Sequence, residues 1–554
     1  MGGIGLLGMS AWMLYHCVGI SLSWRMNFFC FVITFSFRIG DSVCKGTNKI
    51  QYLQKKQLVS LLCSLLFVIL RLIMIILLSV FLYFAALFTI SRWTGRRATN
   101  ETFFRANRRS PWYMVAFGMV GASISGVTFV SVPGMVQASQ MTYLQVCLGF
   151  IVGYVIVAWV LLPLYYRLNL TSIYAYLGRR LGSRSYQTGA WFFLLSKMTG
   201  SAVKFYVVCM ILQRFVFLPL GVPFAVNAGL MVLLIWLYTR QGGIGTLVFT
   251  DTFQTLCLFT ALLLIIYNVI GDMGLSMGQA VQIVSDSPMS RVFIMDDWMS
   301  KYNFWKQFLS GVFIVIVMTG LDQDMMQKNL TCKTLREAQK DMCCYGVAFL
   351  PANLLFLSLG VLLTMIPSLS GIRGDELLPA YVSSKLLTPH SSLLTPLLFI
   401  IGIVAASFSS ADSALTSLTT SYCVDIRQKP GDERLRRRTH IVMCLIFILF
   451  ILAFRTLNST SLIDAIYILV SYTYGPLLGL FSFGLFTRMK PNDRWVPYIC
   501  VASPLLCYAA DTLMRQFAGY QFGYELLMLN GLLTFTGLWI SSRYTRSAAS
   551  QIPS

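Results

Sequence analysis

The stretch GASISGVTFVSVPG occupies residues 121–134, within an apolar run that extends from 112 to 134. It combines small residues and hydroxyls with Gly126 and Pro133, which weaken a regular helix. A helix that breaks at mid-membrane frees backbone carbonyls, and these are hard oxygen ligands for a small cation. Small residues also allow helices to pack closely in a bilayer. The stretch therefore predicts either a broken, ion-binding span or a tightly packed one.

The whole chain has the composition of a membrane protein. Of its 554 residues, 56% are hydrophobic and only 12% are charged, whereas a soluble domain carries roughly 25% charged residues. Because lipid satisfies no backbone polar group, the apolar runs are expected to be helices. We predict an all-α polytopic membrane protein with about 13 transmembrane helices, at 73–93, 112–134, 142–167, 187–213, 220–238, 248–270, 305–325, 342–366, 392–422, 440–457, 463–486, 495–513 and 521–541.

The basic residues behind the net charge of +22 are also arranged as in a membrane protein. Lysines and arginines gather in the loops after the odd-numbered spans, which is the positive-inside pattern rather than a nucleic-acid-binding surface. We therefore expect a multi-pass protein of the plasma (inner) membrane, with the N-terminus outside, the C-terminus cytoplasmic and no nucleic-acid partner. The 14 cysteines show no paired metal-ligand spacing and are interpreted as buried free thiols.

The predicted domain organisation has three parts. Residues 1–72 form an N-terminal extension whose apolar patches are interrupted by charges, which indicates either extra helices or a start site placed too far upstream. Residues 73–541 form the transmembrane domain, and 542–554 a cytoplasmic tail.

A second polar stretch lies inside the predicted span 392–422. Ser409, Asp412, Ser413 and Thr416 recur at steps of three and four, so they share one helical face. Hydroxyls often bond back to the preceding turn of their own helix. A carboxylate at mid-span, however, needs a cationic partner, so the face also suits a hard cation such as sodium.

Three further polar regions of the chain are functional candidates. Asp251 and Gln254 lie on one helical face just inside a span. They are predicted to act either as ion ligands or as an interfacial cap on the start of the helix. Lys204 lies deep in the span 187–213, where it could pair with Asp251 or Asp412 or meet an anionic substrate. The charges of the segment 320–330 are predicted to lie at the cytoplasmic interface with a structural or gating role.

With these motifs the chain resembles the sodium/solute symporter family, which includes symporters for glucose, proline, iodide and sialic acid. The resemblance runs from about residue 73 to 541 and rests on five stretches in family order, at 125–134, 242–254, 322–327, 409–410 and 474–476. It implies the LeuT-type fold, a five-plus-five inverted repeat, here with core repeats at about 112–270 and 305–486.

The resemblance also implies where ions bind. The family's principal sodium site would consist of backbone oxygens and two hydroxyls, from Gly121, Ile124, Ala406, Ser409 and Ser410. The second cation site of some members would use Asp251, Ser409, Asp412 and Ser413. Those members carry a hydroxyl residue in place of Asp412, so this carboxylate could either strengthen a second site or abolish it by pairing with Lys204.

The function implied is uptake of a small organic solute coupled to inward sodium movement by alternating access. Sodium is then the coupling ion and the only metal, and no cofactor is expected. The substrate candidates near the midplane are Ser123, Ser125, Thr128, Gln145 and Lys204. Two alternatives stay open: a proton-coupled symporter that uses Asp251 and Asp412, and a solute sensor that does not transport. An enzyme is not expected, because no nucleophile–base–orienter set is visible.

Overall fold

A computed structural model describes residues 74–96, 99–298, 300–387, 394–455, 462–520 and 522–550. The predicted N-terminal extension, 1–72, lies outside the described residues. Contacts divide the chain into two units. The smaller is Met1–Tyr83 with Cys209–Leu230, and the larger is Phe84–Val208 with Met231–Ser554. All of the sites below lie in the larger unit.

Within these ranges the elements are helices, with one isolated β-bridge between Ser110 and Cys332. A helix at Met74–Gly95 comes first. The long helices that follow are α5 (Trp112–Ser123), α6 (Gly126–Ser139), α7 (Tyr143–Ile156), α10 (Ser183–Leu212), α11 (Phe224–Thr239), α12 (Ile244–Asp272), α14 (Phe304–Val315), α16 (Leu335–Thr364), α18 (Leu394–Ser421), α19 (Glu433–Phe454), α20 (Leu462–Phe486), α21 (Val496–Ala518) and α22 (Leu526–Ser550). The shorter ones are α4 (Asn100–Arg105), α8 (Leu162–Arg167), α9 (Ala175–Arg180), α13 (Met277–Asp286), α15 (Gln323–Asn329) and α17 (Leu377–Leu387).

The predicted spans agree with these helices. Nine described helices are long and apolar enough to cross a bilayer, and two bent pairs raise the number to eleven. The remaining two predicted spans correspond to α11, which has only 16 residues, and to α22, which is not among the eleven. The prediction of an all-helical polytopic membrane protein is confirmed. The loops expected at 271–304 and 367–391 contain the short helices α13 and α17.

The two bent pairs occupy equivalent places in the predicted repeats. Helices α5 and α6 form one pair, bent by 60°, and α14 with α15 forms the other, bent by 70°. Each pair opens one of the two predicted core repeats. In the first pair, Ile124 and Ser125 have extended backbone between the two helices. This break leaves the last carbonyls of α5 without intrahelical partners.

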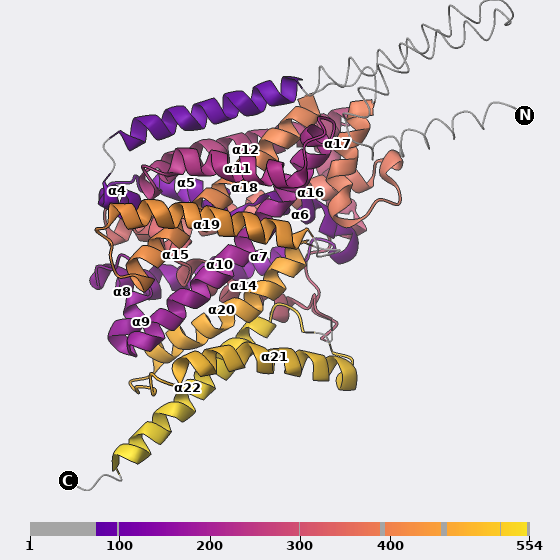
Figure 1. Ribbon diagram of the computed structural model, residues 1–554. Helices are drawn as coiled ribbons and strands as arrows, with labels where there is room; N and C mark the ends of the chain where they lie inside the picture. Colours follow the sequence, from indigo (N-terminus) through magenta and orange to yellow (C-terminus); the bar gives the residue numbers. More distant parts are fainter. Residues whose placement is uncertain are drawn as a thin grey trace, which may run out of the picture. The chain divides into compact units, whose positions relative to one another are not determined.

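Small residues also explain how the broken pair packs. Helix α5 packs against α12 and α18, which lie against each other (Figure 1). A Cβ atom on Gly121 would overlap the Thr255 side chain of α12, and one on Gly126 would overlap Ser407 of α18. The 121–134 stretch is therefore both broken and closely packed, since its glycines bring neighbouring helices close.

The segment 320–330 is buried inside the bundle. Every residue of α15 is buried, and Asp322, which caps its N-terminus, is buried too. The bend after α14 turns this short helix into the bundle, where it packs against α5 and α18. This burial inside the bundle was not predicted, because the hydropathy pattern carries no information on the bend.

Candidate functional site

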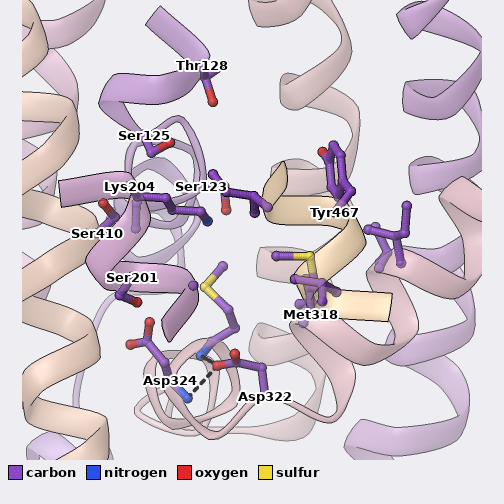
Figure 2. A pocket seen from close by; sticks show the side chains of 18 of the residues that line it. Ser123, Ser125, Thr128, Ser201, Lys204, Met318, Asp322, Asp324, Ser410 and Tyr467 are labelled. Carbon is purple, nitrogen blue, oxygen red and sulfur yellow. Dashed lines mark hydrogen bonds between the residues drawn. The ribbon is translucent and has the colours of Figure 1, made fainter. Parts of the chain in front are cut away.

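A cavity of about 110 Å³ lies inside the larger unit, next to the break in α5–α6 (Figure 2). Its walls come from α5, α6, α7, α10, α14 to α16, α18 and α20. The polar and charged side chains that line it are Ser123, Ser125, Thr128, Tyr143, Tyr154, Ser196, Lys197, Ser201, Lys204, Thr319, Asp322, Asp324, Tyr345, Ser410, Tyr467 and Tyr474. The arrangement suits a small polar solute, since hydroxyls, ammonium groups and carboxylates converge on one space.

Four of the five predicted substrate residues line this cavity: Ser123, Ser125, Thr128 and Lys204. Ser123 shares a hydrogen bond with the Tyr345 hydroxyl across the cavity wall. The fifth, Gln145, is not among the lining residues. Its amide nitrogen donates to the Tyr302 carbonyl at 3.0 Å, and its oxygen accepts from the Ile294 backbone at 3.3 Å. Gln145 therefore tethers the loop before α14.

The base of the cavity carries an ion-pair cluster. Lys197 on α10 lies 3.2 Å from Asp322 and 2.7 Å from Asp324. The Tyr474 hydroxyl of α20 donates to Asp322 at 2.6 Å. Asp322 also accepts from the backbone of Asp324, at 2.8 Å, and so caps α15. One ammonium group thus serves two buried carboxylates.

Two polar groups in the cavity lack a partner. Lys204 makes neither an ion pair nor a hydrogen bond with any residue in the described part of the chain. The Oδ1 atom of Asp324 is buried and accepts no hydrogen bond from the described residues. Figure 2 shows both side chains at the cavity, together with Ser201. A buried polar atom without a partner is costly, which makes the Oδ1 atom of Asp324 a candidate for contact with a bound solute. The half-buried ammonium group of Lys204, which lines the cavity, is a second candidate.

The residues of the predicted sodium site lie on two neighbouring helices. Gly121 and Ile124 belong to the end of α5, and Ala406, Ser409 and Ser410 lie on α18, which packs against it. Ser409 donates its hydroxyl hydrogen to Asp251 at 2.8 Å, and Ser410 donates to the Ser407 carbonyl at 3.0 Å. Because both hydrogens are used within the protein, the oxygen lone pairs of both hydroxyls remain available for a cation. The oxygen donors present fit a sodium ion.

The residues predicted for a second cation site are only partly brought together. Asp251 contacts Ser409, but its other oxygen lies 2.7 Å from the Lys328 ammonium of α15. Asp412 accepts from the Tyr238 hydroxyl at 2.6 Å and from Ser413 at 3.3 Å. The structure places neither carboxylate against Lys204, which was one of the options left open by the sequence.

The sequence predicts a structural or gating role for the charges of 320–330, but it predicts neither the pairing of Lys328 with Asp251 nor that of Lys197 with Asp322 and Asp324. A usable signal existed for Lys328, because it follows Asp324 by four residues and therefore shares its helical face. That spacing marks a charged face, but it does not identify Asp251 as the partner on another helix.

Known proteins resemble this chain in sequence and in fold. The model of the sodium:solute symporter family matches residues 103–492. The sodium/sialic acid symporter NanT of Aliivibrio fischeri is 26% identical over 82% of this chain and 92% of its own length. SiaT of Proteus mirabilis, another sodium/sialic acid symporter, is 24% identical over 73% of this chain and 83% of its own length. A solved structure of a Na+-coupled sialic acid symporter, in a substrate-bound outward-open state, covers 85% of this chain and 98% of its own, with a TM-score of 0.71 and 20% identity.

Proposed function

Because this chain belongs to the sodium:solute symporter family, we propose that its solute is a small carboxylic acid that also carries a hydrogen-bond donor. The chain is a multi-pass membrane transporter that couples inward sodium movement to uptake of a small organic solute by alternating access. What remains to be proposed is the chemistry of the solute, the residues that hold it and the ion ligands.

The observation that carries the proposal is the ammonium group of Lys204 in the cavity wall, which has no ion pair or hydrogen bond with any of the described residues. A carboxylate is its natural partner, since hydrogen bonds between charged groups are stronger than neutral ones. The free Oδ1 of Asp324 accepts from a donor on the same solute, such as a hydroxyl, an amide N–H or an ammonium group. Ser123, Ser125 and Thr128 provide further hydroxyls along the wall. Two relatives named for sialic acid transport an acid, which supports this class of solute.

The proposed sodium site is the one between the α5 break and α18. Carbonyls of Gly121, Ile124 and Ala406 and the hydroxyls of Ser409 and Ser410 supply neutral oxygen ligands. Ser410 also lines the solute cavity, so an ion at this site lies next to the solute. Bound sodium then favours solute binding, and the solute must raise the affinity for sodium by the same factor.

We further propose the orientation that the basic loops indicate, with the N-terminus outside and the C-terminus cytoplasmic in the plasma (inner) membrane. In this orientation the break between α14 and α15 places the Lys197 cluster on the cytoplasmic side of the cavity. The cluster then closes the inner end of the solute path when the outer end is open.

The test is uptake by the full chain reconstituted in liposomes with an inward sodium gradient. Solutes are compared in sets of three: a hydroxy or amino acid, its amide, and the same acid without the hydroxyl or amino group. The proposal predicts sodium-driven uptake of the first member, with weaker uptake of the third and little of the amide. Equal uptake of the acid and its amide would contradict a role for Lys204 in recognising a carboxylate.

A further inference from the structure

The strongest unassigned feature is a charged cluster buried between α12, α15 and α18. It consists of Asp251, Lys328 and Ser409, each at most 2% exposed. The Lys328 ammonium lies 2.7 Å from one oxygen of Asp251, and Ser409 donates to the other oxygen at 2.8 Å. One oxygen of the carboxylate therefore accepts a hydrogen bond, and the other lies against a positive charge in an ion pair.

The neighbouring carboxylate on α18 is occupied in the same way. Asp412 accepts from Tyr238 through one oxygen and from Ser413 through the other. A cation that bound Asp251 and Asp412 would have to displace hydrogen-bonded groups and an ammonium group. It would also lie beside the positive charge of Lys328, and like charges at about 4 Å inside a protein weaken binding by roughly a thousandfold.

We propose that the Lys328 ammonium permanently takes the place of a second coupling cation at Asp251, so that one sodium ion moves in each cycle. The residues predicted for a second sodium site do not fit a metal ion in this chain, because the protein provides its own cation there. The inference rests on the proposed function, since it presumes the sodium site at the α5 break.

Asp251 also contacts the remaining sodium site. Lys328 lies against one oxygen of Asp251, and the other oxygen accepts the hydrogen of Ser409. The oxygen of Ser409 is thereby fixed as an acceptor for the ion at the α5 break. If the solute is a monoanion, one sodium ion also makes the cycle electrically neutral.

The experiment counts the sodium ions bound by the purified full chain, using radioactive sodium at saturation, and measures melting temperatures in sodium and choline chloride. The variants are Lys328→Ala, which vacates the position, and Lys328→Arg, which keeps the charge. The matched control is Lys385→Ala, because Lys385 forms an ion pair at 2.6 Å with Asp272 in a more exposed place. The double variant Asp251→Asn/Lys328→Met removes both charges together. It leaves neither of the two charges buried without the other, so it keeps the test usable if a single variant fails to fold.

The proposal predicts one sodium ion per unmodified chain and two per Lys328→Ala chain. Sodium is expected to stabilise Lys328→Ala more than it stabilises the unmodified chain, because the vacated carboxylate binds the extra ion. The Lys328→Arg, Lys385→Ala and double variants are expected to bind one ion.

Two ions on the unmodified chain would overturn the proposal, as would a double variant that binds one ion fewer than the unmodified chain. A Lys328→Ala chain that folds and still binds one ion would also overturn it. No sodium bound by the unmodified chain would instead refute the proposed sodium site, so the two failures are distinguishable.

Discussion

Asp251 and Asp324 are both buried aspartates that lie 2.7 Å from a lysine ammonium, yet their surroundings differ in how completely the charges are matched. At Asp251, one carboxylate meets one ammonium group and one hydroxyl, so the two opposite charges are balanced one to one. At the cavity base, Lys197 serves both Asp322 and Asp324, and an oxygen of Asp324 remains without a hydrogen bond.

This difference separates two uses of buried charge. A fully matched pair contributes a fixed arrangement, because moving either partner leaves the other uncompensated. At the cavity base, one ammonium group faces two carboxylates, and Lys204 lies nearby. Polar or charged groups of a bound solute can complete these contacts. We therefore assign the Asp251 region to the architecture of the ion site and the cavity base to solute binding.

The largest effect is expected from breaking the matched pair. Asp251→Asn leaves the Lys328 ammonium buried without a counter-charge, which costs about 3–5 kcal/mol in comparable pairs. The melting temperature in detergent should fall by several degrees, and the double variant Asp251→Asn/Lys328→Met should recover most of the loss. A single variant as stable as the unmodified chain would show that the two groups are not coupled.

A different outcome is expected in the cavity. Lys204→Met removes a charge that has no partner among the described residues, so the melting temperature should be unchanged or higher. The affinity for the acid identified in the uptake assay should drop about 10- to 100-fold, the range for a hydrogen bond to a charged group. Lys204→Arg, which keeps the charge, is the control and should retain most of the affinity. A large loss of stability in Lys204→Met would place Lys204 in the architecture rather than in the binding site.

Ser409 contacts Asp251 and belongs to the proposed sodium site. Its removal therefore tests whether the Asp251 region is part of the architecture of the ion site. Ser409→Ala deletes a sodium ligand and one hydrogen bond to Asp251. The sodium concentration for half-maximal uptake should rise about tenfold, equivalent to about 1.4 kcal/mol. Ser417→Ala, on the same helix and bonded to its own backbone, is a matched control that should leave sodium dependence unchanged. The same sodium dependence in both variants would remove Ser409 from the ion site.

The smallest effect is expected from an exposed pair. Arg291 and Asp296 lie 2.9 Å apart, but their side chains are 51% and 71% exposed. The backbone donor at Asp296, and after it the guanidinium group of Arg291, lower the pKa of the Asp296 carboxyl, so the pair is charged at neutral pH. Solvent screens such pairs, so Arg291→Gln should change neither the melting temperature nor uptake measurably. A marked loss of uptake would indicate that the 291–296 loop takes part in the cycle.

Much of the fold could be predicted from the sequence, because long apolar runs and loop charges report directly on spans. The break at 124–125 was also readable, since Ser125, Gly126 and Pro133 all weaken a helix. The inward turn of α15 could not be predicted. A short charged segment after an apolar run looks like an exposed loop, and only the positions of the surrounding helices show that it is buried.

The residues of the candidate sites also differ in how far the sequence predicts them. Residues close together on one helix, such as Ser409 and Ser410, could be grouped from their spacing. Pairings between helices could not: Asp251 meets Lys328 rather than Lys204, and Gln145 bonds to a loop backbone instead of lining the cavity. Such pairings depend on how helices distant in sequence pack, which periodicity does not report.

The most direct test of the account is the melting temperature of the purified full chain in sodium, potassium and choline chloride at equal ionic strength and fixed pH. A ligand that binds only the folded state raises its stability, by about 2.7 kcal/mol at 100 times its dissociation constant. We predict that sodium alone raises the melting temperature. Identical curves in the three salts would contradict the sodium site at the α5 break and favour proton coupling through Asp412.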